Sequence, residues 1–336
     1  MRVVVTGGAG FLGSHLVNAL LGRSDEVICV DNLSTGNINN LDHASGSSKF
    51  RFLFADVCDG IRIDEKVDAV AHLASPASPP DYHRLPLETL AVGSRGTEAA
   101  LRLADINHAR FILASTSEVY GDPLIHPQTE SYWGNVNPIG PRSVYDEAKR
   151  YAEAATSAYR RSMGTNTGIV RIFNTYGPKM RANDGRVVSS FIVQALLGDP
   201  LTIYGDGSQT RSFCYVDDLV RGLIAMLDSS EPGPINLGNA QERTMLELAE
   251  LVLRLSCSNS PIQHFPLPID DPTRRRPDLT RAQQLLNWLP EIGAEDGVAR
   301  TIRWFSEQSA EIRSASSDLA GSQADQSLIP MVVGAK

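Results

Sequence analysis

Tyr145 and Lys149 are the two side chains of this sequence whose types and spacing point most directly to chemistry. They lie four positions apart, so on a helix they share one face. A phenol has an ordinary pKa of about 10 and is a poor base at neutral pH, but a neighbouring ammonium group favours the phenolate. We therefore expect Tyr145 to accept a proton. A helix that buries its tyrosine and exposes its lysine has the same spacing, so the neighbouring motifs must decide between these two interpretations.

A polar segment, Ser115 to Glu118, follows the apolar run Phe111 to Leu113. Such a run is typical of a buried strand. Polar groups at the carboxyl end of a parallel strand point into the crevice in which doubly wound sheets bind their ligands. The segment is therefore expected to contact a substrate.

Three glycines, Gly7, Gly10 and Gly13, lie between a strand-like run at residues 3–5 and a helical pattern. Glycine permits a tight turn and a close approach of the backbone to a pyrophosphate, and the helix N-terminus supplies N–H donors. Asp31 follows 18 positions after Gly13, at the end of the second expected strand, where a carboxylate can bind ribose hydroxyls and repel a 2′-phosphate. The motif therefore predicts NAD rather than NADP. The alternative is a structural turn followed by an ordinary strand-end Asp.

Short apolar runs alternate with amphipathic segments in the first half of the chain, which predicts a parallel sheet with helices on both faces. The expected strands are residues 3–5, 27–30, 50–54, 69–73, 111–113 and 168–172, and the expected helices include 143–163, 187–197, 216–227 and 245–255. We expect an α/β fold with a doubly wound sheet in residues 1–176 and a smaller second domain, interleaved with the first, in residues 177–308. Residues 309–336 are rich in Ser, Ala, Gly, Asp and Gln and are predicted to be disordered. Asp56 ends the third strand and is expected either to face an adenine or to cap its loop.

Composition and charge exclude several classes of function. The 336 residues carry a net charge of -8, which disfavours a nucleic-acid partner. The four cysteines lie far apart without a C-x-x-C pair, so neither a disulfide framework nor a metal site is expected. No run of 18 apolar residues and no leader pattern occurs, and we expect a cytoplasmic protein with no membrane partner.

Several long segments of the sequence, beyond the motifs above, resemble one known family. They are residues 72–82, 115–123, 126–128, 132–134, 136–142 and 171–178. Over residues 1–305 the chain is similar to the extended short-chain dehydrogenase/reductases that act on nucleotide sugars, and within them to the UDP-glucuronate decarboxylases, or UDP-xylose synthases. The resemblance implies a Rossmann fold, NAD as cofactor and a second domain that binds the nucleotide sugar. It also implies a homodimer that forms through two helices per subunit, one of them carrying Tyr145 and Lys149.

The resemblance implies roles for individual residues. The expected catalytic residues are Tyr145, Lys149, Thr116, Ser117 and Glu118, with Tyr145 as the base that takes the proton of the sugar 4-hydroxyl. The expected NAD contacts are Gly7, Gly10, Phe11, Leu12, Gly13, Asp31, Asn32, Thr35, Gly36, Asp56, Leu73, Tyr145, Lys149, Thr175 and Arg186. The expected substrate contacts are Pro79, Tyr82, Ser117, Glu118, Glu147, Tyr159, Asn174, Arg211 and Arg275. Of these, Asn174, Arg211 and Arg275 are expected to bind the diphosphate, with Tyr159 close by.

The chain departs from the family pattern at three positions. Ala148, Asn135 and Lys179 stand where the family has Gly, His and Arg. None of these differences removes a proposed catalytic group.

The implied reaction is the NAD-dependent decarboxylation of UDP-glucuronate to UDP-xylose, the activity of a carboxy-lyase. Oxidation at C4 of the sugar places a ketone β to the C6 carboxylate, so CO2 can leave while the electrons delocalise into an enolate. Reduction at C4 then restores the cofactor, and no external reductant is required.

Other functions remain open as alternatives. Related 4,6-dehydratases have Thr-Asp-Glu where this chain has Thr116-Ser117-Glu118, and a serine is a weak acid for the expulsion of a hydroxyl group. Related 4-epimerases typically lack the glutamate. A non-catalytic NAD-sensing scaffold is disfavoured, because such proteins tend to lose the Tyr or the Lys, and both are present here.

Four side chains permit a structural and a functional interpretation. Arg274, Arg275 and Arg276 either form a solubilising surface or clamp a diphosphate, and the clamp is favoured for Arg275 but not for its two neighbours. Trp133 could pack on a substrate or in the core, and core packing is favoured.

Overall fold

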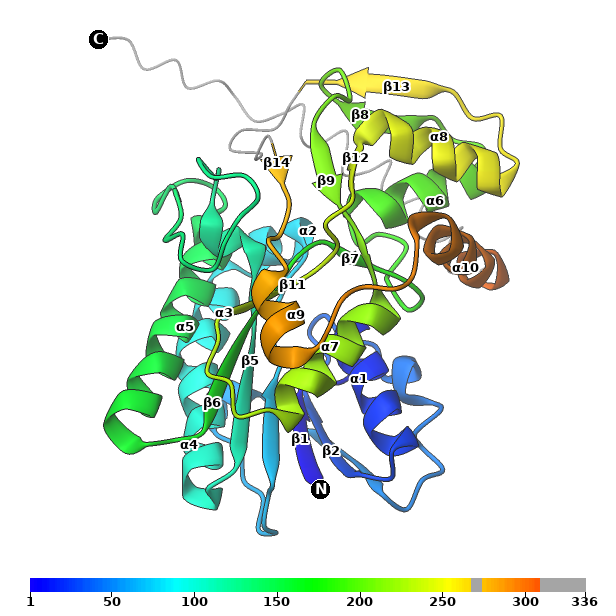
Figure 1. Ribbon diagram of the computed structural model, residues 1–336. Helices are drawn as coiled ribbons and strands as arrows, with labels where there is room; N and C mark the ends of the chain where they lie inside the picture. Colours follow the sequence, from blue (N-terminus) through cyan, green and yellow to red (C-terminus); the bar gives the residue numbers. More distant parts are fainter. Residues whose placement is uncertain (267–273, 309–336) are drawn as a thin grey trace.

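Seven parallel strands form the central sheet of this computed structural model, which describes residues 1–266 and 274–308 (Figure 1). The strands are β1 (Arg2–Thr6), β2 (Glu26–Asp31), β3 (Phe50–Phe54), β4 (Ala69–His72), β5 (Arg110–Thr116), β6 (Thr167–Ile172) and β11 (Ile235–Leu237). Their order is β11-β6-β5-β4-β1-β2-β3, and every neighbouring pair is parallel. The order reverses between β1 and β4, where a doubly wound sheet opens its ligand crevice. The predicted α/β class is confirmed, whereas the predicted tail, residues 309–336, lies outside the described residues.

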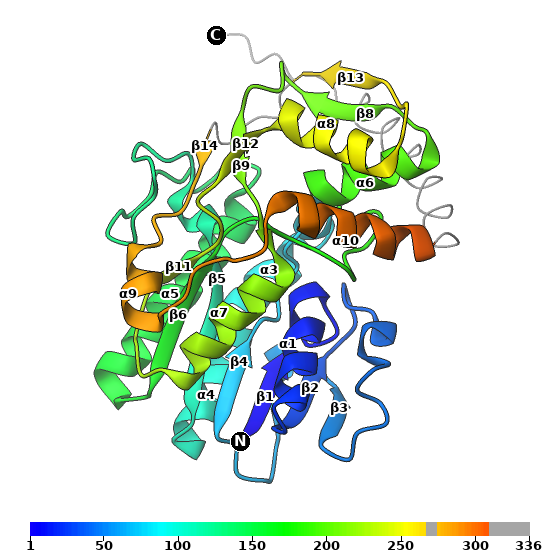
Figure 2. The ribbon, with the colours of Figure 1, turned by 45° about the vertical axis from the view of Figure 1, so that its right-hand side comes forward.

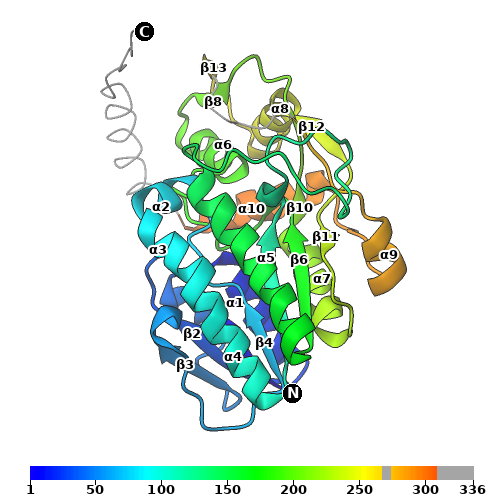
Figure 3. The ribbon, with the colours of Figure 1, turned by 90° about the vertical axis from the view of Figure 1, so that its left-hand side faces the viewer.

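Helices cover both faces of the sheet, because successive strand residues point to opposite faces and both sets are apolar. In β1, Val3 and Val5 belong to one buried cluster and Val4 to another. The covering helices are α1 (Phe11–Gly22), α3 (Pro86–Ala91), α4 (Thr97–Asn107), α5 (Ser143–Met163) and α7 (Val216–Asp228). α1 and α7 lie side by side on one face (Figure 2), and α3, α4 and α5 cover the other (Figure 3).

A smaller region lies above the carboxyl ends of the strands (Figure 1). Its elements are α6 (Val187–Leu197), α8 (Met245–Ser256), α10 (Ala294–Glu307), β8 (Leu201–Tyr204), β9 (Thr210–Ser212), β12 (Glu242–Thr244), β13 (Ile262–Phe265) and β14 (Arg274–Arg275). The three helices pack on one another, and the strands form two small sheets, β12-β9-β14 and β13-β8. Further elements are α2 (Pro79–Arg84), α9 (Thr280–Leu286), and the paired strands β7 (Thr175–Tyr176) and β10 (Cys214–Tyr215).

Residues from the second half of the chain also build the main sheet. β11 follows α7 and pairs with β6, with Ile235 opposite Val170. Buried Arg110, at the start of β5, donates to the carbonyl groups of Met226 and Glu231 at 3.1 and 2.7 Å and so ties this late segment to the sheet. The sequence pattern does not reveal β11, because three residues are too few to show a periodicity.

The elements that carry the candidate site agree closely with their predicted ranges. The helix predicted at residues 143–163 has these bounds in the structure. The strand predicted at 111–113 extends to Thr116, because Ser115 and Thr116 continue to pair with β6. Within residues 1–266 and 274–308, the helices are too short or too polar to cross a lipid bilayer.

Candidate active site

The turn between β1 and α1 is shaped to receive an anion. Gly7 has a φ of +71°, and a Cβ at this position would lie 2.7 Å from the backbone of Ala74. A Cβ at Gly13 would collide with the carbonyl oxygen of Gly7. Gly10 is the N-cap residue of α1. Because glycine has no side chain to accept hydrogen bonds, the first N–H groups of the helix stay available for an anion. This cradle fits the pyrophosphate of a dinucleotide.

Asp31 ends β2 beside this turn and is buried. Its carboxylate accepts hydrogen bonds from the N–H groups of Ala9 (2.9 Å) and Leu33 (2.8 Å). Burial raises the pKa of Asp31, and the two amides act in the opposite direction. The carboxylate therefore ties the glycine turn to the end of β2, where the ribose of NAD is expected.

Other residues expected to bind NAD gather around the same turn. Asn32 donates from Nδ2 to Asp56 at 2.9 Å, and Asp56 accepts from the N–H of Cys58 at 2.8 Å, so Asp56 caps its loop. The guanidinium carbon of Arg186 lies over the ring of Phe11, 5.7 Å from its centroid. The structure thus brings the carboxyl ends of β2 and β3 and the N-terminus of α6 together around the glycine turn.

The remaining expected NAD contacts lie at the edges of this region. The N–H of Leu73, after β4, donates to the carbonyl of Thr6 at 3.1 Å. A Cβ at Gly36 would lie 3.1 Å from the Cβ of Ala9. Thr175, in β7, donates its hydroxyl proton to the carbonyl oxygen two residues earlier at 2.8 Å. Thr35 adjoins Gly36 in the chain, and Leu12 packs partly buried against the core.

Tyr145 and Lys149 lie on one face of α5 at the carboxyl end of β5, as their spacing predicts. The Nζ atom of Lys149 donates to the carbonyl of Ala114 at 2.8 Å and lies 5.8 Å from the centroid of the Tyr145 ring. Burial lowers the pKa of Lys149 to about 8. The positive charge beside the phenol is therefore lost as the pH rises through about 8.

The phenol of Tyr145 is buried and stacked. The ring of Tyr82, from α2, lies almost parallel to it, with the centroids 5.3 Å apart and the planes at 10°. Burial and then the charge of Glu118 raise the pKa of Tyr145, whereas Thr116 and Arg186 act in the opposite direction. Groups that favour the phenolate therefore come from β5 and from the N-cap of α6, whereas Asp146 on α5 itself acts against it.

Glu118 follows β5 and is held by two arginines. Arg275 binds both carboxylate oxygens, with Nη2 2.7 Å from Oε2, and Nη2 of Arg142 lies 2.9 Å from Oε2. Burial opposes the ionisation of Glu118, but the charges of Arg275 and Arg142 outweigh burial and lower the pKa to about 2. Glu118 is therefore a carboxylate at neutral pH. The sequence motifs assign no role to Arg142, although it ends the family-like segment 136–142.

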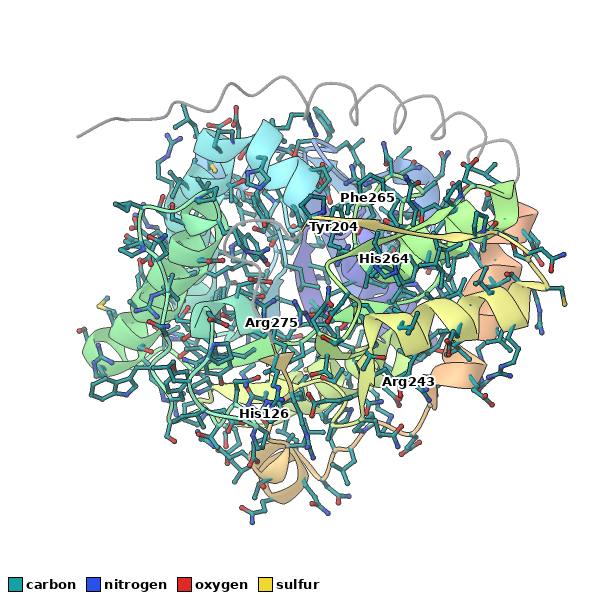
Figure 4. All side chains as sticks on the ribbon, turned by 90° about the horizontal axis from the view of Figure 1, so that it is seen from above. His126, Tyr204, Arg243, His264, Phe265 and Arg275 are labelled. Carbon is teal, nitrogen blue, oxygen red and sulfur yellow. The ribbon has the colours of Figure 1, made fainter. Side chains whose placement is uncertain are left out.

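Three arginines are aligned across the small sheet β12-β9-β14. Arg243 in β12 and Arg275 in β14 both lie opposite Arg211 in β9. Figure 4 labels the first and last of them, which come from the two outer strands. Directly opposite side chains share one face of a sheet, and like charges there are destabilising. This cationic row is suited to an anionic ligand. The sequence does not single out Arg243, because strand pairing is a tertiary feature.

Of the three consecutive arginines, Arg275 is the one that reaches the site. Arg274 is exposed, and Arg276 lies 3.6 Å from Glu242, which also contacts His126 at 3.0 Å. Asn174 lies between β6 and β7, and its carbonyl accepts from the N–H group that begins β10, at 2.8 Å. Pro79 begins α2, the helix that carries Tyr82.

Three residues lie away from the places expected for them, and for Tyr159 and Glu147 the substrate contact itself stays a prediction. Tyr159 is 14 residues beyond Tyr145 on α5, about 21 Å along the helix at 1.5 Å per residue, and packs against the buried core rather than at the site. Glu147, two residues after Tyr145, lies on the other side of the helix, 3.6 Å from Arg150. Trp133 is 88% exposed rather than in the core, because the loop is held by its backbone: Arg150 donates to the Trp133 carbonyl at 3.0 Å.

Comparison with known proteins agrees with this geometry. The model of the NAD dependent epimerase/dehydratase family matches residues 3–238, more than half of the chain. This chain belongs to that family. NAD is accordingly the cofactor of this chain, and the resemblance to extended short-chain dehydrogenase/reductases is confirmed.

Within the NAD dependent epimerase/dehydratase family, the chain is similar to named enzymes. It is 51% identical to UDP-glucuronic acid decarboxylase 1 of Danio rerio over 307 residues, covering 91% of this chain and 73% of that protein. It is 52% identical to UDP-glucuronic acid decarboxylase 1 of Arabidopsis thaliana over 305 residues, covering 91% of this chain and 70% of that protein.

Two solved structures share its fold. The UDP-glucuronic acid 4-epimerase of Bacillus cereus, in complex with UDP-glucuronic acid and NAD, has a TM-score of 0.82 at 27% identity and covers 92% of this chain and 100% of its own. The dTDP-glucose 4,6-dehydratase of Streptomyces venezuelae, with NAD bound, has a TM-score of 0.83 at 31% identity and covers 91% of this chain and 97% of its own.

Proposed function

We propose that this chain is an NAD-dependent UDP-glucuronate decarboxylase that forms UDP-xylose. The observation that carries the proposal is the Glu118 carboxylate, held between two arginines beside Tyr145, in a chain 51% identical over 91% of its length to a UDP-glucuronic acid decarboxylase. An ionised Glu118 next to Ser117 leaves no strong acid at the end of β5 to expel a hydroxyl group, which argues against dehydration.

The glycine turn, Asp31 and Lys149 would hold NAD, which when bound supplies the reversible exchange of hydride with C4 of the sugar. The proton chemistry belongs to the side chains. The Oη atom of Tyr145 takes the proton of the 4-hydroxyl when C4 is oxidised and returns it when C4 is reduced. Tyr82 and Thr116 keep the phenol in place during this cycle, because one stacks on its ring and the other lies beside it.

Loss of CO2 follows from the position of the C4 ketone. The ketone is β to the C6 carboxylate, so the electrons of the breaking C5–C6 bond delocalise onto the C4 oxygen. The phenol of Tyr145, which carries the proton from the 4-hydroxyl at this stage, donates to that oxygen and stabilises the enolate. Glu118 accepts hydrogen bonds from the sugar and is fixed for this role by Arg275 and Arg142.

The diphosphate is assigned to Arg211 and Asn174. Arg275 uses both of its terminal nitrogens on Glu118, and therefore supports the sugar end of the site. Guanidinium groups pair well with phosphate oxygens, and Arg211 lies buried between two further arginines of the small sheet.

Incubation of the purified protein with UDP-glucuronate and NAD, followed by mass spectrometry, tests the proposal. A product lighter by one CO2 is the expected result. An isomer of unchanged mass would instead establish 4-epimerisation, and loss of water from UDP- or dTDP-glucose would establish dehydration. Binding of NAD without turnover of any of these sugars would leave the sensing scaffold as the function.

We also infer that two copies associate through α3 and α5. These helices pack on each other and leave Leu87, Leu90 and Tyr151 exposed by 75%, 40% and 44%. A two-fold pair would cover these side chains, and a two-fold dimer is the commonest oligomer. Light scattering of the wild type and of Leu87→Glu tests the inference, and a monomeric wild type would overturn it.

A further inference from the structure

Asp146 is a buried carboxyl group to which the reaction above gives no role. It follows Tyr145 in the first turn of α5 and is 6% exposed. Its Oδ1 atom is buried and has no hydrogen-bond partner in the part of the chain that the structure describes. A charged carboxylate oxygen that is buried without a hydrogen bond is costly, whereas the oxygen of a neutral carboxyl group is much less so. The surroundings of Asp146 therefore favour its protonated form.

Asp146 belongs to the same group of charges as Glu118. Its N–H donates to the carbonyl of Arg142 at 3.3 Å, one helical turn earlier, so the two side chains are neighbours on α5. The guanidinium of Arg142 in turn binds Glu118 at 2.9 Å. The charged or titratable side chains that act on Asp146 or feel its charge are Glu118, Glu147, Arg142, Arg275, Tyr82 and Tyr145.

The two carboxyl groups of this cluster are in opposite protonation states. Glu118 is ionised between its two arginines. Burial, and then the negative charge of Glu118, raise the pKa of Asp146 to about 7, and Arg142 and Arg275 offset only part of this rise. Neighbouring carboxyl groups whose pKa values are driven apart are a common arrangement of acid and base in one active site.

The proposed reaction needs such an acid. Tyr145 takes one proton from the 4-hydroxyl and gives it back, so its own cycle is closed. Replacement of CO2 by hydrogen at C5 consumes one further proton in each turnover. Glu118 has no proton to give at neutral pH, and the hydroxyls of Thr116 and Ser117 are weak acids.

We propose that Asp146 is the acid that supplies the proton taken up at C5. This role rests on the proposed decarboxylation. As CO2 leaves, the electron pair of the C5–C6 bond enters the enolate. The enolate then forms the C5–H bond with the proton of Asp146, and the electron pair of the O–H bond stays on Asp146 as a carboxylate. The carboxylate takes up a proton from solvent before the next turnover, so one proton is consumed for each CO2 released.

Asp146→Asn in the NAD-loaded enzyme tests the role, because the amide keeps the size of the side chain but cannot donate an acidic proton. We expect kcat to fall about 100-fold, as is usual for the loss of a general acid, while KM for UDP-glucuronate stays within about two-fold. The part of the fall of kcat that lies near pH 7 should disappear in the variant and return in Asp146→Glu, whereas a fall near pH 8 from Lys149 should remain in both variants. Glu250→Gln, an exposed carboxyl on α8, is the matched control and should behave as the wild type.

Infrared spectroscopy supplies a readout that does not depend on turnover. The wild type should show the carbonyl band of a protonated carboxyl group that disappears as the pH rises through neutrality, and Asp146→Asn should lack that band. Absence of the band in the wild type, or an unchanged kcat and pH profile in Asp146→Asn, would overturn the role of Asp146 alone. A wild type that releases no CO2 would overturn the decarboxylase proposal and this role with it.

Discussion

Arg275 and Glu118 join the small upper sheet to the main sheet through a two-bond ion pair, although 157 positions separate them in the chain. Glu118 follows β5, next to the candidate proton-transfer residues, and Arg275 lies in β14, next to the arginine that is assigned to the diphosphate. One contact therefore links the segment that carries the proposed sugar contacts to the small sheet that carries the proposed diphosphate contact. Both groups are largely buried, so removal of either leaves an incompletely compensated charge.

Arg275→Met should destabilise the protein by roughly 3 kcal/mol and abolish most activity, because Glu118 would keep only Arg142 as a partner. Urea unfolding of the variant and the wild type measures the first effect, and product formation from UDP-glucuronate the second. Arg274→Met is the matched control, because Arg274 precedes Arg275 in the chain but its own side chain is exposed. Equal losses in both variants would show that the ion pair is not their cause.

Acid should weaken the fold through Glu118. Its pKa in the folded chain is about 2, below the ordinary value of 4.5. A carboxyl group with a lowered pKa contributes stability that is complete above pH 4.5 and is lost as the pH falls toward 2, an amount of roughly 3 kcal/mol. Unfolding free energies measured between pH 6 and pH 2 should show this loss, of which roughly 2 kcal/mol falls above pH 3. Glu118→Gln should flatten the profile over that range, and a profile as steep as that of the wild type would contradict the assignment.

Tyr82 should act through the ring of Tyr145. Tyr82→Leu removes the stacked ring and should lower kcat by roughly ten-fold or more, since a small displacement of a proton-transfer group has a large effect on rate. Tyr82→Phe keeps the ring and should retain most of the activity. A strong loss in Tyr82→Phe would point instead to a direct role of the Tyr82 hydroxyl.

Gly13→Ala should prevent NAD binding, because its Cβ would collide with the carbonyl oxygen of Gly7. Gly22→Ala, at the other end of α1, meets nothing within 4 Å and should bind NAD as the wild type does. Calorimetric titration with NAD, together with circular dichroism to check folding, distinguishes the two variants. Normal NAD affinity in Gly13→Ala would place the pyrophosphate elsewhere.

Arg243→Gln should have opposite effects on stability and binding. Removal of a like charge opposite Arg211 should raise the unfolding free energy of the ligand-free protein by about 0.2–1 kcal/mol. The same change should weaken UDP binding several-fold, because one cation of the arginine row is lost. Arg254→Gln, an exposed arginine on α8 that pairs with Glu295, is the control. Unaltered UDP affinity in Arg243→Gln would remove Arg243 from the site.

Local signals were sufficient for the elements that carry the site. The glycine spacing and the four-residue spacing of Tyr145 and Lys149 are short-range patterns, and the helix of this pair has its predicted bounds. The contacts of Glu118 could not be predicted, because they depend on how β14 is placed beside β9. Tyr159 and Trp133 lie away from the places expected for them for a related reason. The residue type shows only that a side chain is large and partly polar. Where the side chain lies depends on the path of the helix or loop that carries it.

The pairing of β11 with β6 sets an order of events during synthesis. The nucleotide-binding layer begins at the first residues, yet its edge strand ends at Leu237, and Arg110 finds two of its carbonyl partners only after residue 225. A growing chain can therefore complete this layer only after three elements of the small region, α6, β8 and β9, have been made. The edge of β6 therefore stays unpaired until β11 has been made, and an unpaired strand edge favours wrong pairing with other chains.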